Sequence, residues 1–398
     1  MNSSSIFFGR CIRVGTKCIL VAKQGLDSPF VFVDSPRRRS RRRNIRCWVV
    51  TIHAGSAAAA AAGAGEQQQE GTAAVLVRRD HGHPVRGHPR RAVLFGVPRY
   101  YRHSIAVLSR AVQSWNAHGG ISFCLNLGDI VDGFCPKDRS ADAVQAVVRE
   151  FDGFRGGPVY HMLGNHCLYN LPRSDLVSAL RMPTTSPERA YYDFSPAPGH
   201  RFVVLDAYDF SAVGWPRGHP VSAAARKFLD ARNPNDDKNS PSGLDGADRR
   251  FVMFNGGVGE AQLRWLDAAL RRAARRRERV VVCSHLPVHP GAVSPTGLMW
   301  NYEEVRDVIH SHGAGSCVVA CLAGHFHTGG YAVDGRGVHH RTLEAALECP
   351  PGTDAFGYVE VYPDRLRLVG SGRMKSTEMP LLVDYAASSS SSSSSQLL

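Results

Sequence analysis

The chain has 398 residues, of which 43% are hydrophobic, so it can hold one large or two ordinary domains with a sizeable core. Its charge is uneven: residues 1–92 carry 16 Lys and Arg against 5 Asp and Glu, a net charge of +11, whereas residues 93–398 carry +2. The basic balance therefore describes the N-terminal part, and it does not indicate a nucleic-acid-binding domain in the rest.

Residues 1–92 contain an arginine-rich run at 37–43, alanines at 57–62 and glutamines at 67–69, without a sustained helical or strand period. This composition buries too little surface to order itself, so we expect a disordered leader or an extension added by a faulty gene model. Two alternatives stay open. Few acids with many Arg and Ser also fit an organelle transit peptide, and a basic arm could bind nucleic acid or an anionic surface without specificity.

No transmembrane helix is predicted, because the uncharged stretch 47–65 is mostly Ala and Gly and contains His53. The ten cysteines show no C-x-x-C spacing, which favours a reducing compartment over a disulfide scaffold. We therefore expect a cytoplasmic monomer without a membrane anchor, or a plastid or mitochondrial protein if the leader is a transit peptide.

From residue 93 onwards, apolar runs typical of strands alternate with helical periods. Strands are predicted at 93–97, 121–127, 159–163, 201–206, 279–283, 317–323, 331–333, 338–343, 357–361 and 365–369, and helices at 100–117, 141–154 and 260–276. The strand-helix-strand order predicts parallel pairs, and the last four strands predict antiparallel ones. This suits an α/β fold, a four-layer αββα sandwich of two mixed β-sheets flanked by helices, over residues 93–386, followed by a poly-Ser tail at 387–398.

Four polar motifs follow predicted strands at the point where each strand ends. They are G-D-I-V-D-G at 128–133, G-N-H at 164–166, S-H at 284–285 and G-H-F-H at 324–327. Because strand ends in an open α/β sheet face one crevice, we expect these motifs to converge. Carboxylate, amide and imidazole ligands suit Mn, Fe or Zn, and two such ions roughly 3.5 to 4 Å apart can clamp a phosphoryl group and activate water. The motifs predict metal-assisted phosphoester hydrolysis.

In order and spacing, these motifs resemble those of the calcineurin-like metallophosphoesterases. Further strings are similar to the manganese-dependent ADP-ribose/CDP-alcohol diphosphatases: P-R-Y-Y-R at 98–102, N-G-G at 255–257 with Gln262, Trp265 and Leu266, and M-W-N-Y-E-E at 299–304. The resemblance covers residues 93–384. It implies hydrolysis of the diphosphate bond in ADP-ribose or in CDP-alcohols such as CDP-choline and CDP-glycerol. The implied cofactor is a pair of Mn²⁺ ions, with Mg²⁺, Fe or Zn²⁺ as alternatives.

Carried over by position, the resemblance implies that Asp129 bridges the two ions. Asn165, His285 and His325 would complete the shell of one ion, and His327 would serve the other. His166 would stabilise the phosphoryl transition state or protonate the leaving oxygen, as a positioned imidazole can near neutral pH.

The P-R-Y-Y-R string offers a candidate nucleotide-binding segment. Its residues are Arg99, Tyr100, Tyr101 and Arg102. Guanidinium groups would contact the diphosphate and phenol rings the base of a small nucleotide substrate. The alternative is a helix N-terminus that packs its aromatic side chains.

One family motif is missing. Related enzymes begin the domain with a strand that ends in Asp-x-His or Asp-x-Gln and gives two ligands to the ion held by His327, but the predicted strand 93–97 runs directly into Pro98. Asp80 with His81 and His83 is the nearest substitute, and it precedes that strand. Either a short segment was lost from this reading frame, or the protein is a non-catalytic or impaired relative with one incomplete metal site. A second departure is Cys167, where relatives carry an acidic residue that could position His166.

Overall fold

The computed structural model describes residues 10–14, 17–21, 45–50, 98–312 and 317–382, in two compact units, Met1–Arg43 and Asn44–Leu398. The first unit contains an antiparallel pair of strands, β1 (Arg10–Val14) and β2 (Lys17–Val21). All four predicted metal-binding motifs lie in the second unit.

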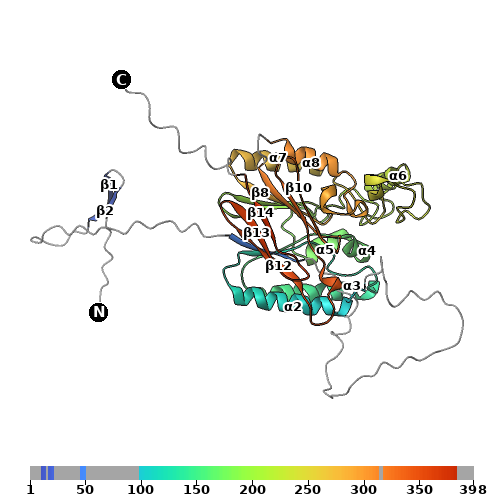
Figure 1. The fold of residues 1–398 in the computed structure, drawn as a ribbon, viewed down its shortest axis with the longest axis horizontal. Coiled ribbons are helices and arrows are strands. Elements are labelled where there is room, and N and C mark those ends of the chain that lie inside the picture. Colours follow the sequence, from blue (N-terminus) through green and yellow to red (C-terminus); the bar gives the residue numbers. More distant parts are fainter. Residues whose placement is uncertain (1–9, 15–16, 22–44, 51–97, 313–316, 383–398) are drawn as a thin grey trace, which may run out of the picture. The chain divides into compact units, whose positions relative to one another are not determined.

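The second unit is built around two six-stranded sheets (Figure 1). The first sheet has the order β10-β11-β9-β8-β7-β6. Its strands are β6 (Tyr192–Ala197), β7 (His200–Val204), β8 (Arg279–Ser284), β9 (Val318–Ala323), β10 (Gly330–Val333) and β11 (His339–Thr342). The inner strands β7, β8, β9 and β11 run parallel, and the two edge strands are antiparallel to their neighbours.

The second sheet has the order β14-β13-β12-β3-β4-β5. Its strands are β3 (Ile45–Val50), β4 (Phe123–Asn126), β5 (Val159–His161), β12 (Ala355–Val361), β13 (Arg365–Gly372) and β14 (Thr377–Pro380). Strands β3, β4 and β5 are parallel, and β12, β13 and β14 form an antiparallel meander. Both sheets are therefore mixed, as predicted.

Helices cover the outer faces of the two sheets (Figure 1). In this view α2 (Tyr101–His118) and α3 (Ser140–Asp152) lie on one side of the sandwich, and α7 (Glu260–Arg275) and α8 (Tyr302–His310) on the other. Shorter helices lie in the connections: α4 (Asn165–Asn170), α5 (Arg173–Ala179), α6 (Pro220–Asp230), and 3₁₀ turns at Lys137–Arg139, Gly246–Arg250, Pro290–Ala292, Pro295–Gly297 and Ala346–Glu348. The predicted four-layer αββα sandwich is confirmed.

Strand β3, which lies beside β4 in the second sheet, was not predicted from the sequence. Residues 93–97 lie outside the described residues, and β3 stands between β12 and β4, with Val50 paired to Asn126. β3 and the β1–β2 pair fall within residues 1–92, for which the sequence predicted no regular structure. The run I-R-C-W-V-V at 45–50 is rich in β-branched and aromatic residues, but the arginines before it and the alanines after it conceal this signal. The substitute motif at 80–83 and the poly-Ser tail lie outside the described residues.

The hydrophobic core fills the space between the sheets and beneath the helices. Phe123 of β4 meets Phe202 of β7 edge to face, with ring centroids 4.9 Å apart, so side chains of the two sheets interdigitate. Under the first helix, Leu108, Ala111 and Trp115 are fully buried at the spacing of one helical face. Each large apolar side chain buried in this way contributes roughly 1.5 to 3 kcal/mol to folding.

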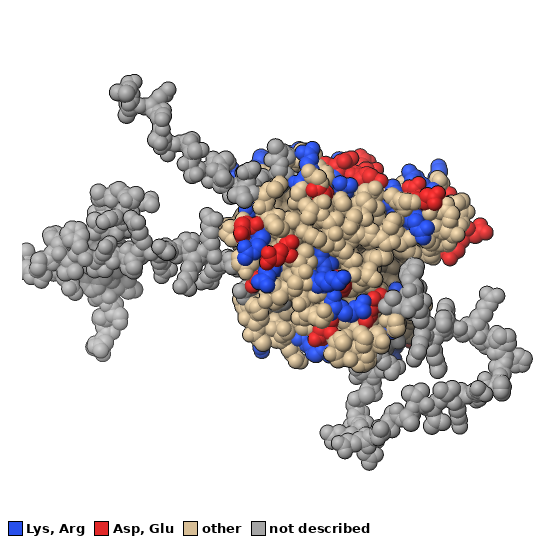
Figure 2. Space-filling view, viewed as in Figure 1, with Lys and Arg blue, Asp and Glu red and all other residues tan. Residues whose placement is uncertain are grey.

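The strand order brings the carboxyl ends of four parallel strands to the motifs. β4 ends before Asp129, β5 before Asn165, β8 before His285 and β9 before His325. On the face shown in Figure 2, Lys and Arg side chains are interspersed with Asp and Glu, in keeping with the near balance of charge after residue 92. Within the described part of the chain, no helix combines the length and apolar character needed to cross a bilayer.

Candidate metal centre

The structure brings three of the predicted ligands together. Ligand-type atoms of Asp129, His285 and His325 all lie within 4.8 Å of one another. His285 Nε2 is 3.1 Å from Asp129 Oδ2 and 3.2 Å from His325 Nδ1. Two imidazole nitrogens and a carboxylate oxygen facing one point form a donor set that suits a divalent transition-metal ion. Asp129 is only 1% exposed, so an ion here would compensate a buried negative charge.

His285 is held in the orientation that a metal ligand requires. Its Nδ1 lies 2.6 Å from the backbone carbonyl oxygen of Leu127. A carbonyl oxygen only accepts hydrogen bonds, so Nδ1 carries the proton and Nε2 offers its lone pair toward Asp129 and His325. The ring is fully buried, which prevents it from turning into another rotamer without displacing its neighbours.

Two of these ligands have backbone conformations that non-glycine residues rarely adopt. Asp129 has φ 55° and His325 has φ 65°, in the left-handed region that costs an L-residue roughly 1 to 2 kcal/mol. Among the described residues, the other non-glycine residues with positive φ are Arg181 and Arg277, each just beyond the end of a helix. Backbone strain of this kind is typically retained at functional sites, where the position of a side chain matters more than the cost of the conformation.

Two glycines allow the motif loops to approach each other closely. A Cβ atom on Gly164 would lie 2.0 Å from Asp129 Oδ1, and one on Gly128 would lie 2.7 Å from His285 Nδ1. Gly128 also has φ 98°. Gly128 and Gly164 are therefore required, because in the loops after β4 and β5 the backbone lies directly against the side chains of His285 and Asp129 and leaves no room for a Cβ atom.

Asn165, the first residue of α4, is 3% exposed and is oriented by two tyrosines. The Tyr208 hydroxyl donates to Asn165 Oδ1 at 3.2 Å, and Asn165 Nδ2 donates to the Tyr169 hydroxyl at 3.4 Å. Burial, and next the charge of Asp129, raise the pKa of Tyr208 well above its ordinary value, so this hydroxyl stays a neutral donor. The ring of Tyr208 also lies beside that of His285, with centroids 6.0 Å apart.

His166 contacts Asp129 through Oδ1, whereas His285 faces the other carboxylate oxygen, Oδ2. The backbone N–H of His166 donates to Asp129 Oδ1 at 2.9 Å, and its side-chain Nδ1 accepts a hydrogen bond from the Gly133 N–H at 2.9 Å. A neutral imidazole that accepts at Nδ1 carries its proton on Nε2. The arrangement therefore presents an Nε2–H group, which can act as a proton donor.

Asp132 is an acidic residue beside His166, but it does not orient the ring, because His166 Nδ1 already accepts a hydrogen bond and has no proton to donate. Asp132 Oδ2 lies 3.4 Å from His166 Nδ1, while its Oδ1 accepts from the Phe134 N–H at 2.9 Å, so it both shapes the turn and faces the imidazole. Cys167 is fully buried, and burial raises the pKa of its thiol to about 11. The hydrogen bond from the Gly133 N–H therefore orients His166, and Cys167 packs as a small apolar group.

His327 stands apart from the tight trio and has a charged outer partner. Its Nδ1 lies 3.0 Å from Glu348 Oε1, and Glu348 Oε2 accepts from Arg373 Nη2 at 2.8 Å. Glu348 lies in the 3₁₀ turn that follows β11 and is 6% exposed. A histidine that engages a carboxylate through Nδ1 offers Nε2 as its ligand atom.

The histidines of G-H-F-H are kept neutral, which metal binding requires. Burial lowers the pKa of His325 well below its ordinary value, and the neighbouring His285 lowers it further. Burial also lowers the pKa of His327, against the opposing effect of its hydrogen bond to Glu348.

The P-R-Y-Y-R string reaches the same region from the start of α2. The charge of Arg99 acts on His327, Glu348 and Tyr101, so its guanidinium lies close to these three side chains. Burial, and next the carboxylate of Asp132, raise the pKa of Tyr101. The structure thus brings Arg99 and Tyr101 to the site.

The other two residues of the string are placed differently. The Tyr100 N–H donates to the carbonyl oxygen of Leu347 at 2.7 Å, which ties the start of α2 to the turn that carries Glu348. The ring of Tyr100 lies 6.3 Å from that of His103, on the same helix, as the packing alternative expects. The side chain of Arg102 lies outside the described part of the structure.

Comparison with known proteins agrees with this geometry. Residues 98–329 match the model of the calcineurin-like phosphoesterase family. The chain belongs to this family. A manganese-dependent ADP-ribose/CDP-alcohol diphosphatase of Oryza sativa subsp. japonica is 66% identical over 284 residues, which are 71% of this chain and 87% of the relative. A protein of the same name from Arabidopsis thaliana is 59% identical over 283 residues, 71% of this chain and 89% of the relative.

A solved structure supports the same fold for this calcineurin-like phosphoesterase. A dimetal phosphatase from Danio rerio is 34% identical and superimposes with a TM-score of 0.71, covering 85% of this chain and 99% of that one. That protein is a dimetal phosphatase, and in the present chain Asp129 is the residue predicted to bridge two ions.

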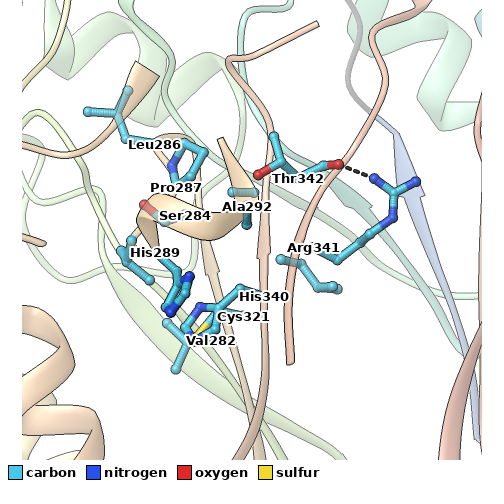
Figure 3. Close-up of a pocket in the computed structure, with 13 residues that line it drawn as sticks. Val282, Ser284, Leu286, Pro287, His289, Ala292, Cys321, His340, Arg341 and Thr342 are labelled. Atoms are coloured by element: carbon cyan, nitrogen blue, oxygen red, sulfur yellow. Dashed lines mark hydrogen bonds between the residues drawn. The ribbon is translucent and has the colours of Figure 1, made fainter. Parts of the chain in front are cut away.

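The cavity drawn in Figure 3 is separate from the metal centre. It is lined by residues of β8, β9 and β11 and of the loop after β8, and none of the predicted metal ligands is among them. Figure 3 shows the ring of His289 close to that of His340, and the two ring centroids are 4.5 Å apart. Ser284, which lines the cavity, directly precedes the predicted ligand His285 in the sequence.

Sequence reasoning missed Tyr208, Glu348 and Arg373. Tyr208 follows the end of β7, and Glu348 follows the end of β11, so both occupy positions like those of the recognised ligands. A polar residue just after a strand could have indicated these two site residues, but many ordinary turn residues occupy the same kind of position. Arg373 lies just after β13 and comes near His327 only through the packing of one sheet on the other.

Proposed function

We propose that this protein hydrolyses the diphosphate bond of ADP-ribose and CDP-alcohols in the presence of Mn²⁺, giving AMP or CMP and a phosphorylated alcohol. The trio of Asp129, His285 and His325, whose ligand-type atoms lie within 4.8 Å of one another, carries this proposal. The names of the plant relatives, at 66% and 59% identity over most of their length, support the substrate class.

Asp129, Asn165, His285 and His325 would hold one ion, and Asp129 and His327 would contribute to the second. Such ions supply positive charge for the phosphoryl oxygens and a water that is easier to deprotonate. Their donor set accepts Mn²⁺, and Mg²⁺, Fe or Zn²⁺ remain the alternatives because ligand type alone does not select among them.

The chain's own groups have distinct tasks in this proposal. His166 carries its proton on Nε2 and would give this proton to the leaving phosphate oxygen. Arg99 would balance the charge of the second phosphate of the substrate, since its guanidinium lies near His327. Tyr101, half-buried near Asp132, would border the same space.

The test is the turnover of ADP-ribose, CDP-choline and CDP-glycerol by the purified full chain with Mn²⁺, followed as AMP or CMP release. Asp129→Asn should abolish turnover of all three, because the carboxylate that both ions need is replaced by an amide. Asp334→Asn is the matched control: Asp334 is 8% exposed and also contacts histidines, His310 and His340, but lies outside the site. Unchanged turnover in Asp129→Asn would overturn the proposal.

A second candidate function is favoured by one observation. Among the described residues, the predicted set leaves Asp129 and His327 for the second ion, whereas the first has four ligands. A nucleotide- or metal-binding relative without catalysis would bind one Mn²⁺ per chain and release no AMP or CMP. Elemental analysis together with the turnover assay separates the two functions.

A further inference from the structure

The two ion positions differ in the outer partners of their histidines. His285 Nδ1 binds a backbone carbonyl, that of Leu127, at 2.6 Å. His327 Nδ1 instead lies 3.0 Å from the carboxylate of Glu348. A carboxylate partner makes an imidazole a stronger ligand than a neutral carbonyl does, because it stabilises the positive charge that the ring acquires on binding a cation.

Glu348 is built into its place rather than free to turn away. Its side chain is 6% exposed, and its second oxygen is 2.8 Å from Arg373 Nη2. Burial acts to raise the pKa of Glu348, but the hydrogen bond from His327 and the charges of His327, Arg373 and Arg99 together lower it. Arg373 therefore keeps the carboxylate in position while the side chain of Arg373 remains 37% exposed.

We propose that Glu348, held by Arg373, is a positioning residue that sets the affinity of the ion bound by His327. The inference rests on the metal centre of the proposed function. It concerns the ion position that has fewer ligands among the described residues, where the quality of each ligand matters most. The ion held by Asn165, His285 and His325 does not depend on this pair.

The experiment measures Mn²⁺ binding to the full chain without substrate, by titration with electron paramagnetic resonance of the free ion. Glu348→Gln should weaken one class of site about 10- to 100-fold and leave the other unchanged, which is the size expected for loss of a ligand's outer partner. Loss of turnover should follow the loss of the second ion and be restored at high Mn²⁺ concentration.

The matched control is Glu278→Gln. Glu278 is 7% exposed and pairs with Arg201 at 2.6 Å, but it precedes β8 at the end opposite to the metal centre. It should lower stability without changing either Mn²⁺ affinity. Arg373→Met removes the group that holds Glu348 and should weaken Mn²⁺ binding at the same class of site, but less than Glu348→Gln does. Arg373→Lys keeps the positive charge and should retain part of the wild-type affinity.

Unchanged affinities in both Glu348→Gln and Arg373→Met, with melting curves that show folded protein, would overturn the inference. So would equal weakening of both classes of site, or a single bound ion whose affinity neither variant alters. The proposed function fails separately: wild-type protein that binds two ions, one of them sensitive to Glu348, but hydrolyses none of the substrates would contradict only that function.

Discussion

His166 is held in one neutral tautomer by a backbone group, which makes its chemical role testable with a single substitution. The Gly133 N–H occupies Nδ1, so the proton is on Nε2. We expect His166→Gln to lower kcat by roughly 10²- to 10⁴-fold, the range for loss of a general acid, with Mn²⁺ stoichiometry unchanged. Steady-state kinetics with ADP-ribose measures this. His289→Gln, at the cavity of Figure 3, is the control and should keep full activity.

Gly164 tests how closely the metal-binding loops must pack. In Gly164→Ala the new methyl carbon would lie 2.0 Å from Asp129 Oδ1 and 2.6 Å from the Asp129 nitrogen, so the loop must move. We expect a loss of about 1 to 3 kcal/mol in the free energy of unfolding and a larger loss of Mn²⁺ affinity. Gly218→Ala, with open space around its Cβ position, should change neither quantity. Wild-type Mn²⁺ affinity in Gly164→Ala would contradict the packing described here.

Among the elements, β3 is the one whose contribution is least expected from the sequence. It has partners on both sides, because Val49 pairs with Gly357 of β12 and with Leu125 of β4. Val49→Pro should remove a ladder hydrogen bond and destabilise the second unit by about 3 kcal/mol or more. Thermal unfolding measures this effect.

Ile12→Pro is the control for the β3 substitution. Ile12 lies in β1, in the first compact unit, where it pairs with Ile19. It should leave the main unfolding transition unchanged. If Val49→Pro melts like the wild type, β3 is not part of the cooperative unit.

At the scale of the whole molecule, each sheet contains a buried neutral histidine. Burial lowers the pKa of His161 in β5 to about 4, and it lowers that of His340 in β11 to about 4. The unfolded chain takes up these protons near pH 6.5, before the folded protein does. The stabilisation is therefore fully present above pH 6.5 and is lost as the pH falls toward 4, on the order of 3 kcal/mol for each histidine.

Urea unfolding between pH 7.5 and 4.5 should show this loss. His161→Gln should flatten the pH dependence, since the amide can replace the hydrogen bond to Asn126 but does not titrate in this range. His118→Gln, an exposed position, should keep the wild-type slope. A variant at His161 with an unaltered slope would mean that other groups determine acid sensitivity.

The fold and much of the site could be predicted because their signals are local. Runs such as residues 279–283 are apolar enough to be strands in any context, and a polar residue just after such a run faces the crevice. β3 could not be found in this way, because its six residues carry a strand signal no stronger than that of other short runs in the leader. Glu348 and Arg373 could not be linked to His327 because their contact depends on how one sheet packs on the other.

The unusual backbone conformations described above fall into two groups with opposite consequences. At Asp129 and His325 the left-handed backbone aims a ligand, so replacing either residue to relax the chain would remove the chemistry. At Arg181 and Arg277 the same conformation only closes α5 and α7, where glycine is the residue that ordinarily stands. Glycine in place of Arg181 or Arg277 should therefore raise the free energy of unfolding by about 1 kcal/mol at each helix end. Both positions lie away from the proposed metal centre, so an engineered variant could be more stable without loss of activity.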